Sequence, residues 1–201
     1  INSAISLNYP ENKLEIIVVD NSSDDFEELQ IWTDYVNSLN GKNNITTKFI
    51  HRTGREGFKP RNMDLALKES SSEFILFLDI DSTIDVNALL YTMPLFSTDA
   101  KLGYVQMHTI QTNGRYNSFL ANINAARINI HRFLQGVRSH GGFCLFYGHN
   151  AIWRNTTLKK IGKCEEYYGK NIVITEDFAL SIRALQAGFY GKTIWVKSGE
   201  W

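Results

Sequence analysis

The chain is poor in cysteine, has no excess of charge of either sign and contains no long apolar run. Its two cysteines, Cys144 and Cys164, have neither the density of a disulfide-rich domain nor metal-ligand spacing, so a reduced, cytosolic setting is the simpler interpretation. Lys plus Arg and Asp plus Glu both total 21, and the lack of a basic tract argues against nucleic acid as a partner. No signal peptide is recognisable, and no apolar stretch approaches the roughly 18 residues of a membrane span. Length and composition favour one globular domain over the 201 residues.

An apolar run that ends on two acids is the most informative feature that is present. Residues 74–78 (FILFL) precede Asp79 and Asp81, a pattern typical of a strand that is buried on both faces and emerges at the edge of a sheet. If the chain stays extended there, the two carboxylates point to the same side and repel each other unless a cation lies between them. Oxygen ligands with open positions for phosphate oxygens suit Mg²⁺ or Mn²⁺. A D-x-D pattern also arises by chance, so the evidence for a metal or phosphate site is its position directly after the strand.

Strand-like apolar segments alternate with helical segments along almost the whole chain. Strands are expected at residues 14–19, 47–51, 74–78, 104–107, 143–153 and 192–196, and helices at about 25–36, 63–67, 86–96, 117–137 and 178–187. This alternation predicts an α/β fold with a mostly parallel central sheet and helices on both faces.

The helix expected at residues 117–137 carries apolar side chains at helical spacing. Its stripe consists of Phe119, Leu120, Ile123, Ala126, Ile130, Phe133, Leu134 and Val137. Packing against the core is the expected role of this stripe, and a membrane-surface or domain contact is the alternative.

Two further acidic sites follow apolar segments. Asp20 follows residues 14–19, and Glu176 with Asp177 follows residues 172–174. Asp20 could simply open a turn, and the acidic pair could favour the dipole in the first turn of a helix. Because strand ends in such a sheet meet in one crevice, we expect these acids to converge with Asp79 and Asp81.

Two loops complete the set of candidate site segments. Residues 51–62 (HRTGREGFKPRN) form the one basic cluster, whose glycines allow a tight loop and whose cations could neutralise a diphosphate; a solvated surface is the alternative. Residues 141–151 (GGFCLFYGHNA) place small residues around His149 and Asn150, which suits close approach of a polyhydroxylated ligand. A lone histidine is more often structural.

The order of these motifs resembles the inverting family-two glycosyltransferases, nearest to the membrane-embedded, cellulose-synthase-like branch. Asp20 follows IIVV, and the segments GFKPRN, LDIDS, FYGHNAIWR, TED and GFYGKTIWVKSGEW come after it, over nearly the whole chain. The resemblance implies a GT-A fold in which residues 1–100 bind the nucleotide sugar and residues 101–201 bind the acceptor. It also implies transfer of a sugar from a nucleotide-diphosphate donor, expected to be a UDP-hexose, to a growing polysaccharide or glycan. Such transfer is metal-dependent, with Mg²⁺ or Mn²⁺, and inverts the anomeric centre.

The family's roles transfer to the matching positions of this chain. The residues expected to bind the nucleotide sugar are Asp20, Asn21, Arg55, Lys59 and Asp79, and those expected to hold the metal are Asp81 and Asp79. Asp177, with Glu176 in the T-E-D motif, is the expected catalytic base. Gly148, His149 and Asn150 are expected to line the acceptor side.

The chain also departs from the family's pattern. Pro60-Arg61 replaces the usual Ala-Gly after Lys59, the family's first strand would precede Ile1, and its Gln-x-x-Arg-Trp motif would follow Trp201. The resemblance therefore implies a longer parent protein at the cell membrane, with membrane helices outside this segment and this domain on the cytoplasmic face. The segment itself is expected to be soluble.

Two other functions stay open. Residues 77–83 (FLDIDST) also match the D-x-D-x-[ST] signature of haloacid-dehalogenase-type phosphatases, with Asp79 as nucleophile and Asp81 as acid. That signature usually lies on the first strand of its fold, whereas two expected strands precede it here. The other alternative is a module that binds nucleotide without turnover, because these residues do not include the Gln-x-x-Arg-Trp motif.

Overall fold

The computed structural model describes residues 1–40, 45–111 and 118–200, which form two compact units. The larger unit consists of Ile1–Asn8, Glu73–Gly162 and Asp177–Trp201, and the smaller unit consists of Tyr9–Ser72 and Lys163–Glu176. We describe each unit by itself. The division into a donor half and an acceptor half near residue 100 concerns binding, and it stays a prediction.

The smaller unit is built on two parallel strands. Strands β1 (Glu15–Asp20) and β2 (Thr46–His51) pair so that Asp20 lies opposite His51 at their carboxyl ends. The remaining elements of the unit are the 3₁₀ helix η1 (Glu11–Lys13), helices α2 (Phe26–Leu39) and α3 (Phe58–Glu69), and the short antiparallel pair β7 (Tyr167–Tyr168) and β8 (Asn171–Ile172). Helix α2 begins where the sequence predicts, because Asp25 caps it by accepting a hydrogen bond from the Glu28 N–H at 3.0 Å.

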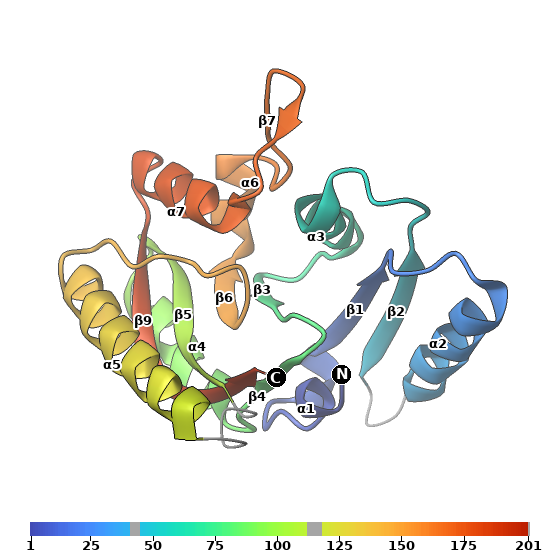
Figure 1. The fold of residues 1–201 in the computed structure, drawn as a ribbon, viewed down its shortest axis with the longest axis horizontal. Coiled ribbons are helices and arrows are strands. Elements are labelled where there is room, and N and C mark those ends of the chain that lie inside the picture. The colour runs from blue at the N-terminus through green and yellow to red at the C-terminus, as the bar shows by residue number, and fades with distance from the viewer. Residues whose placement is uncertain (41–44, 112–117, 201) are drawn as a thin grey trace. The chain divides into compact units, whose positions relative to one another are not determined.

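The larger unit is built on a five-stranded sheet in the order β3-β6-β5-β9-β4 (Figure 1). Its strands are β3 (Phe74–Phe77), β4 (Ser82–Ile84), β5 (Leu102–Gln111), β6 (Ala151–Arg154) and β9 (Tyr190–Glu200). Its helices are α1 (Asn2–Ile5), α4 (Ala88–Thr98), α5 (Ser118–His140), α6 (Asn155–Ile161) and α7 (Glu176–Gln186). Helices α4 and α5 lie on opposite faces of the sheet, as expected for an α/β fold (Figure 1).

The strand directions differ from the mostly parallel sheet that the sequence predicts. In the larger unit β5 and β9 are parallel, whereas β3–β6, β5–β6 and β4–β9 are antiparallel. The α/β class is confirmed, but this sheet is mixed. An apolar run reports burial and not direction, so the pattern alone could not separate the two arrangements.

An aromatic cluster forms the core of the larger unit. The Tyr104 ring stacks on the Trp153 ring with centroids 4.2 Å apart and an interplanar angle of 18°. The Phe146 ring meets Trp153 edge-on at 5.3 Å, and all three side chains are buried. This packing holds the segment before β6 against β5, where the candidate site begins.

Several predicted elements are shorter or less buried than expected. The strand predicted at residues 143–153 is wrong over residues 143–150, and only Ala151–Arg154 is a strand. The burial predicted for residues 74–78 on both faces is also wrong, because residues 74–76 are only half-buried. Among the described strands β3 pairs with β6 alone, so one of its edges has no strand beside it.

The apolar stripe of α5 does not pack in the core, and that prediction is wrong. Phe119, Ile123, Ile130, Phe133, Leu134 and Val137 are all exposed. The face of α5 that is buried carries polar side chains instead, with Asn124 and Gln135 as its most buried members. Periodicity identifies the helix and its two faces, but not which face meets the sheet.

Candidate active site

The D-x-D acids lie in a tight turn that follows β3. The Ser82 N–H donates to the Asp79 carbonyl at 3.0 Å, which closes a four-residue turn, and the Asp79 N–H donates back to Ser82 Oγ at 3.3 Å. The chain therefore does not stay extended through Asp81, because the turn leads directly into β4. Asp79 is half-buried, whereas Asp81 is exposed.

The same turn is joined to the loop of residues 148–150. Ser82 Oγ and His149 Nδ1 lie 3.2 Å apart in a hydrogen bond, and the Asn150 N–H donates to the Phe77 carbonyl at 2.7 Å. The pairing of β3 with β6 places Phe77 opposite Ala151, so the chain after β3 and the chain before β6 lie side by side. Two of the predicted groups, the D-x-D acids and the acceptor loop, are thus brought together.

The backbone of the 148–150 loop requires unusual conformations. Gly148 has a φ of +84° and Asn150 a φ of +51°, which is the left-handed region that glycine and asparagine tolerate best. Asn150 is fully buried, and its carbonyl accepts a hydrogen bond from the Met107 N–H at 2.9 Å. The small residues predicted around His149 therefore serve the loop conformation.

Gln106 on β5 organises this loop, although the sequence analysis did not select it. Its Nε2 donates to the carbonyls of His149 at 3.0 Å and Asn150 at 3.1 Å, and its Oε1 accepts from the Tyr147 N–H at 2.9 Å. Gln106 is 1% exposed. The sequence feature that could have identified Gln106 is a glutamine between apolar neighbours in an expected strand (YVQM), because a buried amide requires hydrogen-bond partners.

Asp177 lies at the start of α7 and is half-buried, next to the buried Glu176. The Ser181 hydroxyl, one turn further along the helix, donates to the Asp177 carbonyl at 2.9 Å and accepts from the Phe146 N–H at 2.9 Å. The first turn of α7 is therefore attached to the segment that leads into the 148–150 loop. The alternative that these acids open a helix is correct for their position, and it does not conflict with a chemical role for Asp177.

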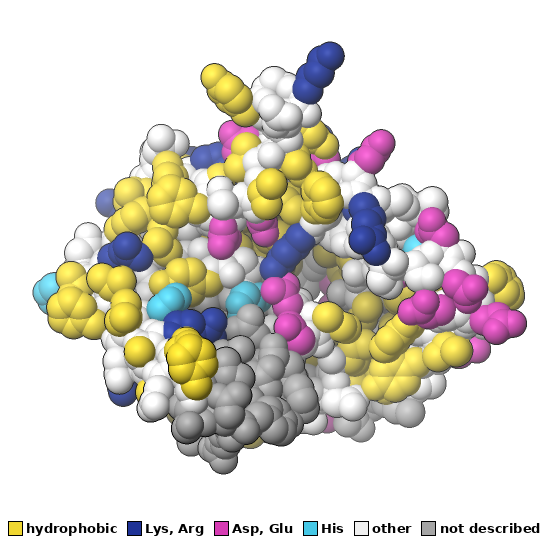
Figure 2. All heavy atoms as spheres, in the orientation of Figure 1, with side chains coloured by type: hydrophobic (Ala, Val, Ile, Leu, Met, Phe, Trp, Pro, Cys, Tyr) yellow, Lys and Arg dark blue, Asp and Glu magenta, His cyan; other side chains and the backbone are white. Residues whose placement is uncertain are grey.

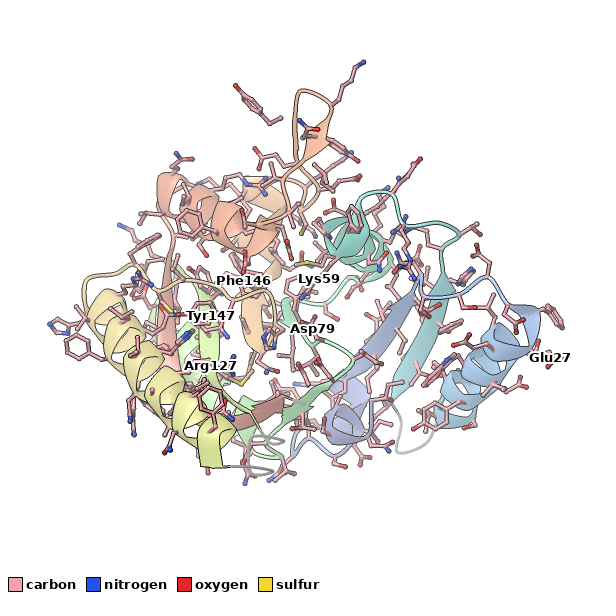
Figure 3. The ribbon with its side chains drawn as sticks, in the orientation of Figure 1. Glu27, Lys59, Asp79, Arg127, Phe146 and Tyr147 are labelled. Carbon is pink, nitrogen blue, oxygen red and sulfur yellow. The ribbon has the colours of Figure 1, made fainter. Side chains whose placement is uncertain are left out.

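A pocket of about 180 Å³ lies in the larger unit between α5, the sheet and the chain before β6. Arg127 and Tyr147 line it from α5 and from that chain (Figure 3). His108, His131 and His149 also line it. Burial, with the nearby cationic groups second, lowers the pKa of His108 to about 4, so this side chain is neutral at physiological pH.

Asp20 is at the centre of a separate cluster in the smaller unit. Its Oδ1 accepts from the Ser22 hydroxyl at 2.6 Å, and its Oδ2 lies 3.3 Å from His51 Nδ1. The other ring nitrogen of His51 lies 3.0 Å from Asp24 Oδ1. His51 therefore orients Asp20, a role that the sequence analysis did not assign to it; its place opposite Asp20 follows from the β1–β2 register.

Asn21 connects the end of β1 to the basic loop. Its Oδ1 accepts from Asn62 Nδ2 at 2.9 Å, and Arg52 Nε donates to Asn62 Oδ1 at 3.0 Å. Arg55 is exposed, and its Nη2 donates to the Ser22 carbonyl at 3.4 Å. The basic loop is thus attached to the Asp20 cluster through backbone and amide groups. These contacts order the loop, although Arg55 itself is exposed to solvent.

Lys59 is half-buried in the first turn of α3, and Pro60 is its neighbour there. Proline is tolerated in the first turn of a helix because its missing N–H would have no helical partner. Gly57 caps the helix with a φ of +74°. Phe58, the first residue of α3, also has a positive φ of +45°, so Pro60 is compatible with the helix although its first turn is irregular.

The structure brings the predicted residues together in two groups. Asp79, Asp81, Gly148, His149, Asn150 and Asp177 lie in the larger unit, and Asp20, Asn21, Arg55, Lys59 and Glu176 lie in the smaller one. Over residues 1–40, 45–111 and 118–200, no three His, Cys, Asp or Glu side chains are grouped as a metal cage requires. Two carboxylates in one turn fit instead a Mg²⁺-type ion, which uses one or two carboxylates and takes its other ligands from water and phosphate.

Comparisons with known proteins identify the family. Residues 1–162 match the family described as glycosyl transferase family 2. A probable glucomannan 4-beta-mannosyltransferase 6 of Oryza sativa subsp. japonica is 26% identical over 213 residues, covering 98% of this chain and 34% of the relative. The poly-beta-1,6-N-acetyl-D-glucosamine synthase of Staphylococcus epidermidis is 29% identical over 182 residues, covering 90% of this chain and 40% of the relative. The chain therefore spans about a third to two fifths of the length of these relatives.

Solved structures show the same fold. The mannosyltransferase PcManGT from Pyrobaculum calidifontis, in complex with GDP-Man and Mn2+, has a TM-score of 0.71 at 19% identity and is matched over 99% of this chain and 51% of its own. S. aureus TarS 1-349 in complex with UDP-GlcNAc has a TM-score of 0.65 at 20% identity, over 100% of this chain and 53% of its own. The predicted GT-A type is confirmed, and the family match favours sugar transfer over the phosphatase interpretation. The chain belongs to glycosyl transferase family 2.

Proposed function

We propose that this chain is the part of an inverting glycosyltransferase that binds a nucleotide-diphosphate sugar and presents it to a glycan acceptor. The observation that carries the proposal is the attachment of the D-x-D turn to the 148–150 loop through Ser82 and His149. A donor held at Asp79 would then lie beside the residues expected to meet an acceptor. A UDP-hexose is the proposed donor, because a similar solved structure contains UDP-GlcNAc and because the motif resemblance implies a UDP-sugar.

The donor side of the proposal concerns charge. A nucleoside diphosphate is polyanionic, and its leaving-group charge grows as the sugar departs. Lys59 at the start of α3 and Arg55 in the basic loop would offset that charge, and the Asp20 cluster with Asn21 would contact the base. Asp79 and Asp81 would hold Mg²⁺ or Mn²⁺, which when bound supplies positive charge for the diphosphate.

Asp177 is the proposed catalytic base. A sugar hydroxyl has a high pKa, so a carboxylate has to accept its proton while the new bond forms. The first turn of α7 is held to the acceptor side through Ser181 and the Phe146 N–H, which gives Asp177 a fixed backbone position. One displacement inverts the anomeric centre, so an α-linked donor gives a β-linked product.

The whole protein is proposed to act at a membrane. Two observations support this proposal: the chain spans only part of its relatives, and its motifs resemble a branch of the family with membrane helices, which would lie outside these residues with this domain on the cytoplasmic face. No helix in the described residues is both long and apolar enough to cross a membrane.

Calorimetric titration of UDP, with Mn²⁺ and with EDTA, tests the donor site. Wild type is expected to bind UDP in a metal-dependent manner, and Asp81→Ala is expected to lose that dependence, because it removes one of two carboxylate ligands. Asp34→Ala is the matched control, since Asp34 is an exposed carboxylate on α2 that accepts a hydrogen bond from Gln30 of the same helix at 2.8 Å. Equal metal-dependent binding by Asp81→Ala would refute the metal assignment.

Asp177→Asn separates binding from chemistry. This variant keeps the shape and hydrogen-bonding capacity of the side chain but cannot accept the proton, so UDP affinity should be retained while sugar transfer falls by about 10²- to 10⁴-fold. Release of UDP from UDP-sugar in the presence of a glycan acceptor measures transfer. A wild-type chain that binds UDP without transfer would favour the nucleotide-binding module, and full transfer by Asp177→Asn would remove Asp177 from the mechanism.

A further inference from the structure

The pocket between α5 and the sheet of the larger unit is rich in groups that attract negative charge. Arg127 and His131 line it from α5, His108 lines it from β5, and His149 lines it from the 148–150 loop. Among the described residues that line this pocket, which we call the α5 pocket, none is Asp or Glu. Figure 2 shows Lys, Arg and His side chains grouped over α5 on the face in view. The α5 pocket therefore suits a ligand that carries negative charge.

The electrostatics of two pocket histidines favour the same kind of ligand. Burial, followed by the charges of Arg127 and Arg138, lowers the pKa of His131. Burial and three cationic groups, of which Arg127 is one, lower the pKa of His108 to about 4. Each charged group that contributes to these two shifts is cationic. An anion bound beside Arg127 would offset this accumulation of positive charge.

Hydrogen bonds hold the walls of the α5 pocket in place. The Thr193 hydroxyl on β9 donates to the Gln106 carbonyl on β5 at 3.1 Å, and Gln106 is almost completely buried. Gln135 joins α5 to Leu145 through two hydrogen bonds of 2.7 Å and 3.1 Å. Because these bonds fix side chains on two walls, binding of a ligand requires little further ordering of the protein.

The α5 pocket adjoins the residues proposed to meet the acceptor. His149 lines the pocket, and its Nδ1 lies 3.2 Å from Ser82 Oγ in the D-x-D turn. A cavity of about 150 Å³ holds a molecule the size of benzene, so the volume of about 180 Å³ has room for a phosphate or a carboxylate with part of its sugar. An acceptor at the 148–150 loop could therefore place a neighbouring group in the α5 pocket.

We propose that the α5 pocket binds an acidic group, a phosphate or a carboxylate, that the acceptor glycan carries close to the hydroxyl that attacks the donor. Arg127 is the main charge partner in this proposal, because the N–H fork of a guanidinium matches two oxygens of either group, and His131 is a second donor. A neutral glycan would gain hydrogen bonds from the same side chains but nothing from their charge. The inference rests on the proposed sugar transfer, and it narrows the acceptor to acidic glycans.

Titrations followed by NMR at the His131 ring test the proposal. The probes are sn-glycerol 3-phosphate for a phosphate-bearing acceptor and D-glucuronate for a uronic acid, with D-glucose as the uncharged comparison. At least one anion should shift the His131 signal saturably, and D-glucose should bind roughly tenfold more weakly or less. The tighter anion identifies the source of the acidic group. No shift with either anion, or equal binding of D-glucose, would overturn the proposal.

Arg127→Gln removes the proposed charge partner and should weaken binding of the anion by roughly tenfold or more. Arg132→Gln is the matched control, because Arg132 is on the same helix but its guanidinium lies over the Trp195 ring at 3.7 Å and does not line the pocket. This control should change the affinity by less than about twofold. Arg127→Lys keeps the charge and should recover part of the binding, which separates loss of charge from loss of fold. Unchanged affinity in Arg127→Gln, or an equal loss in both glutamine variants, would refute the role of Arg127.

Titration of UDP with Mn²⁺ separates this inference from the proposed function. UDP should bind without displacing the anion from the α5 pocket. Displacement would assign the acidic group to the donor diphosphate and overturn the proposal. Metal-dependent UDP binding without any anion binding at His131 would overturn this inference alone. Anion binding at His131 in a chain that does not bind UDP would overturn the proposed function and, with it, the assignment of the anion to an acceptor.

Discussion

Replacing Gln106 with leucine removes the amide that holds the 148–150 loop while keeping a side chain of similar size. Gln106 Nε2 donates to the carbonyls of Met107, His149 and Asn150, and its Oε1 accepts from Tyr147. Asn150 retains its bond from the Met107 N–H, so the groups that lose most are the Tyr147 N–H and the His149 carbonyl. We therefore expect the loop to loosen without a cavity forming in the core.

The magnitude follows from the number of groups that lose a hydrogen bond to Gln106. A buried polar group without its hydrogen bond costs about 1–3 kcal/mol, so two such groups lower the free energy of unfolding by roughly 2–6 kcal/mol. Urea denaturation of Gln106→Leu measures this loss. Amide hydrogen exchange measures its location, and the Tyr147 amide should exchange much faster than in wild type.

Gln135→Leu is the matched control for this variant. Gln135 is also a buried glutamine, but both of its hydrogen bonds go to Leu145 and none to the 148–150 loop. This variant should speed exchange at Leu145 while Tyr147 stays protected. If Gln106→Leu were as stable as wild type and Tyr147 stayed protected in it, our account of how the loop is ordered would be wrong.

Three further predictions concern single groups. The folded-state pKa of His108 is lowered to about 4, so protonation of this side chain disfavours the folded state. The free energy of unfolding should therefore fall by up to about 3 kcal/mol as the pH drops from about 6.5 to about 4, and His108→Gln should abolish this loss. Burial raises the pKa of the Cys144 thiol to about 12, so mass spectrometry should find it unmodified by iodoacetamide at mildly alkaline pH until the chain is unfolded, and native-state labelling would contradict this. Gly57→Ala should lower the free energy of unfolding measured in urea by about 1–3 kcal/mol, because Gly57 has a positive φ and a Cβ there would lie 2.5 Å from Glu165 Oε1. Gly54→Ala should lower it less, because Gly54 also has a positive φ but its Cβ would meet open space.

The sequence predicts the positions of most elements because apolar periodicity and capping are local signals. The helix after Asp25, the strand before Asp79 and the long helix within residues 117–137 are all found within a few residues of their predicted bounds. The family is likewise readable from the order of short motifs, and it is confirmed. These features depend on residues close together in the chain.

The candidate site residues were selected for the same reason, and their roles stay predictions. Asp79, Asp81 and the 148–150 loop were selected by residue type. They lie close together because β3 pairs with β6 in the antiparallel direction. Gln106 and His51 were not given their positioning roles, because each acts through hydrogen bonds to residues about 30 to 40 positions away in the chain. No local pattern reports such a partner.

The sequence by itself therefore determined the α/β class, the start of α2, the family and the place of Asp20 at the end of β1, since all of these depend on neighbouring residues. Only the tertiary structure decided that the sheet of the larger unit is mixed, that residues 79–82 form a turn, and that α5 turns its polar face inward. Strand direction and helix rotation depend on which distant groups satisfy one another's hydrogen bonds. For α5 the bonds of Gln135 and Ser139 outweigh the tendency of its apolar stripe to be buried, and this leaves the stripe exposed.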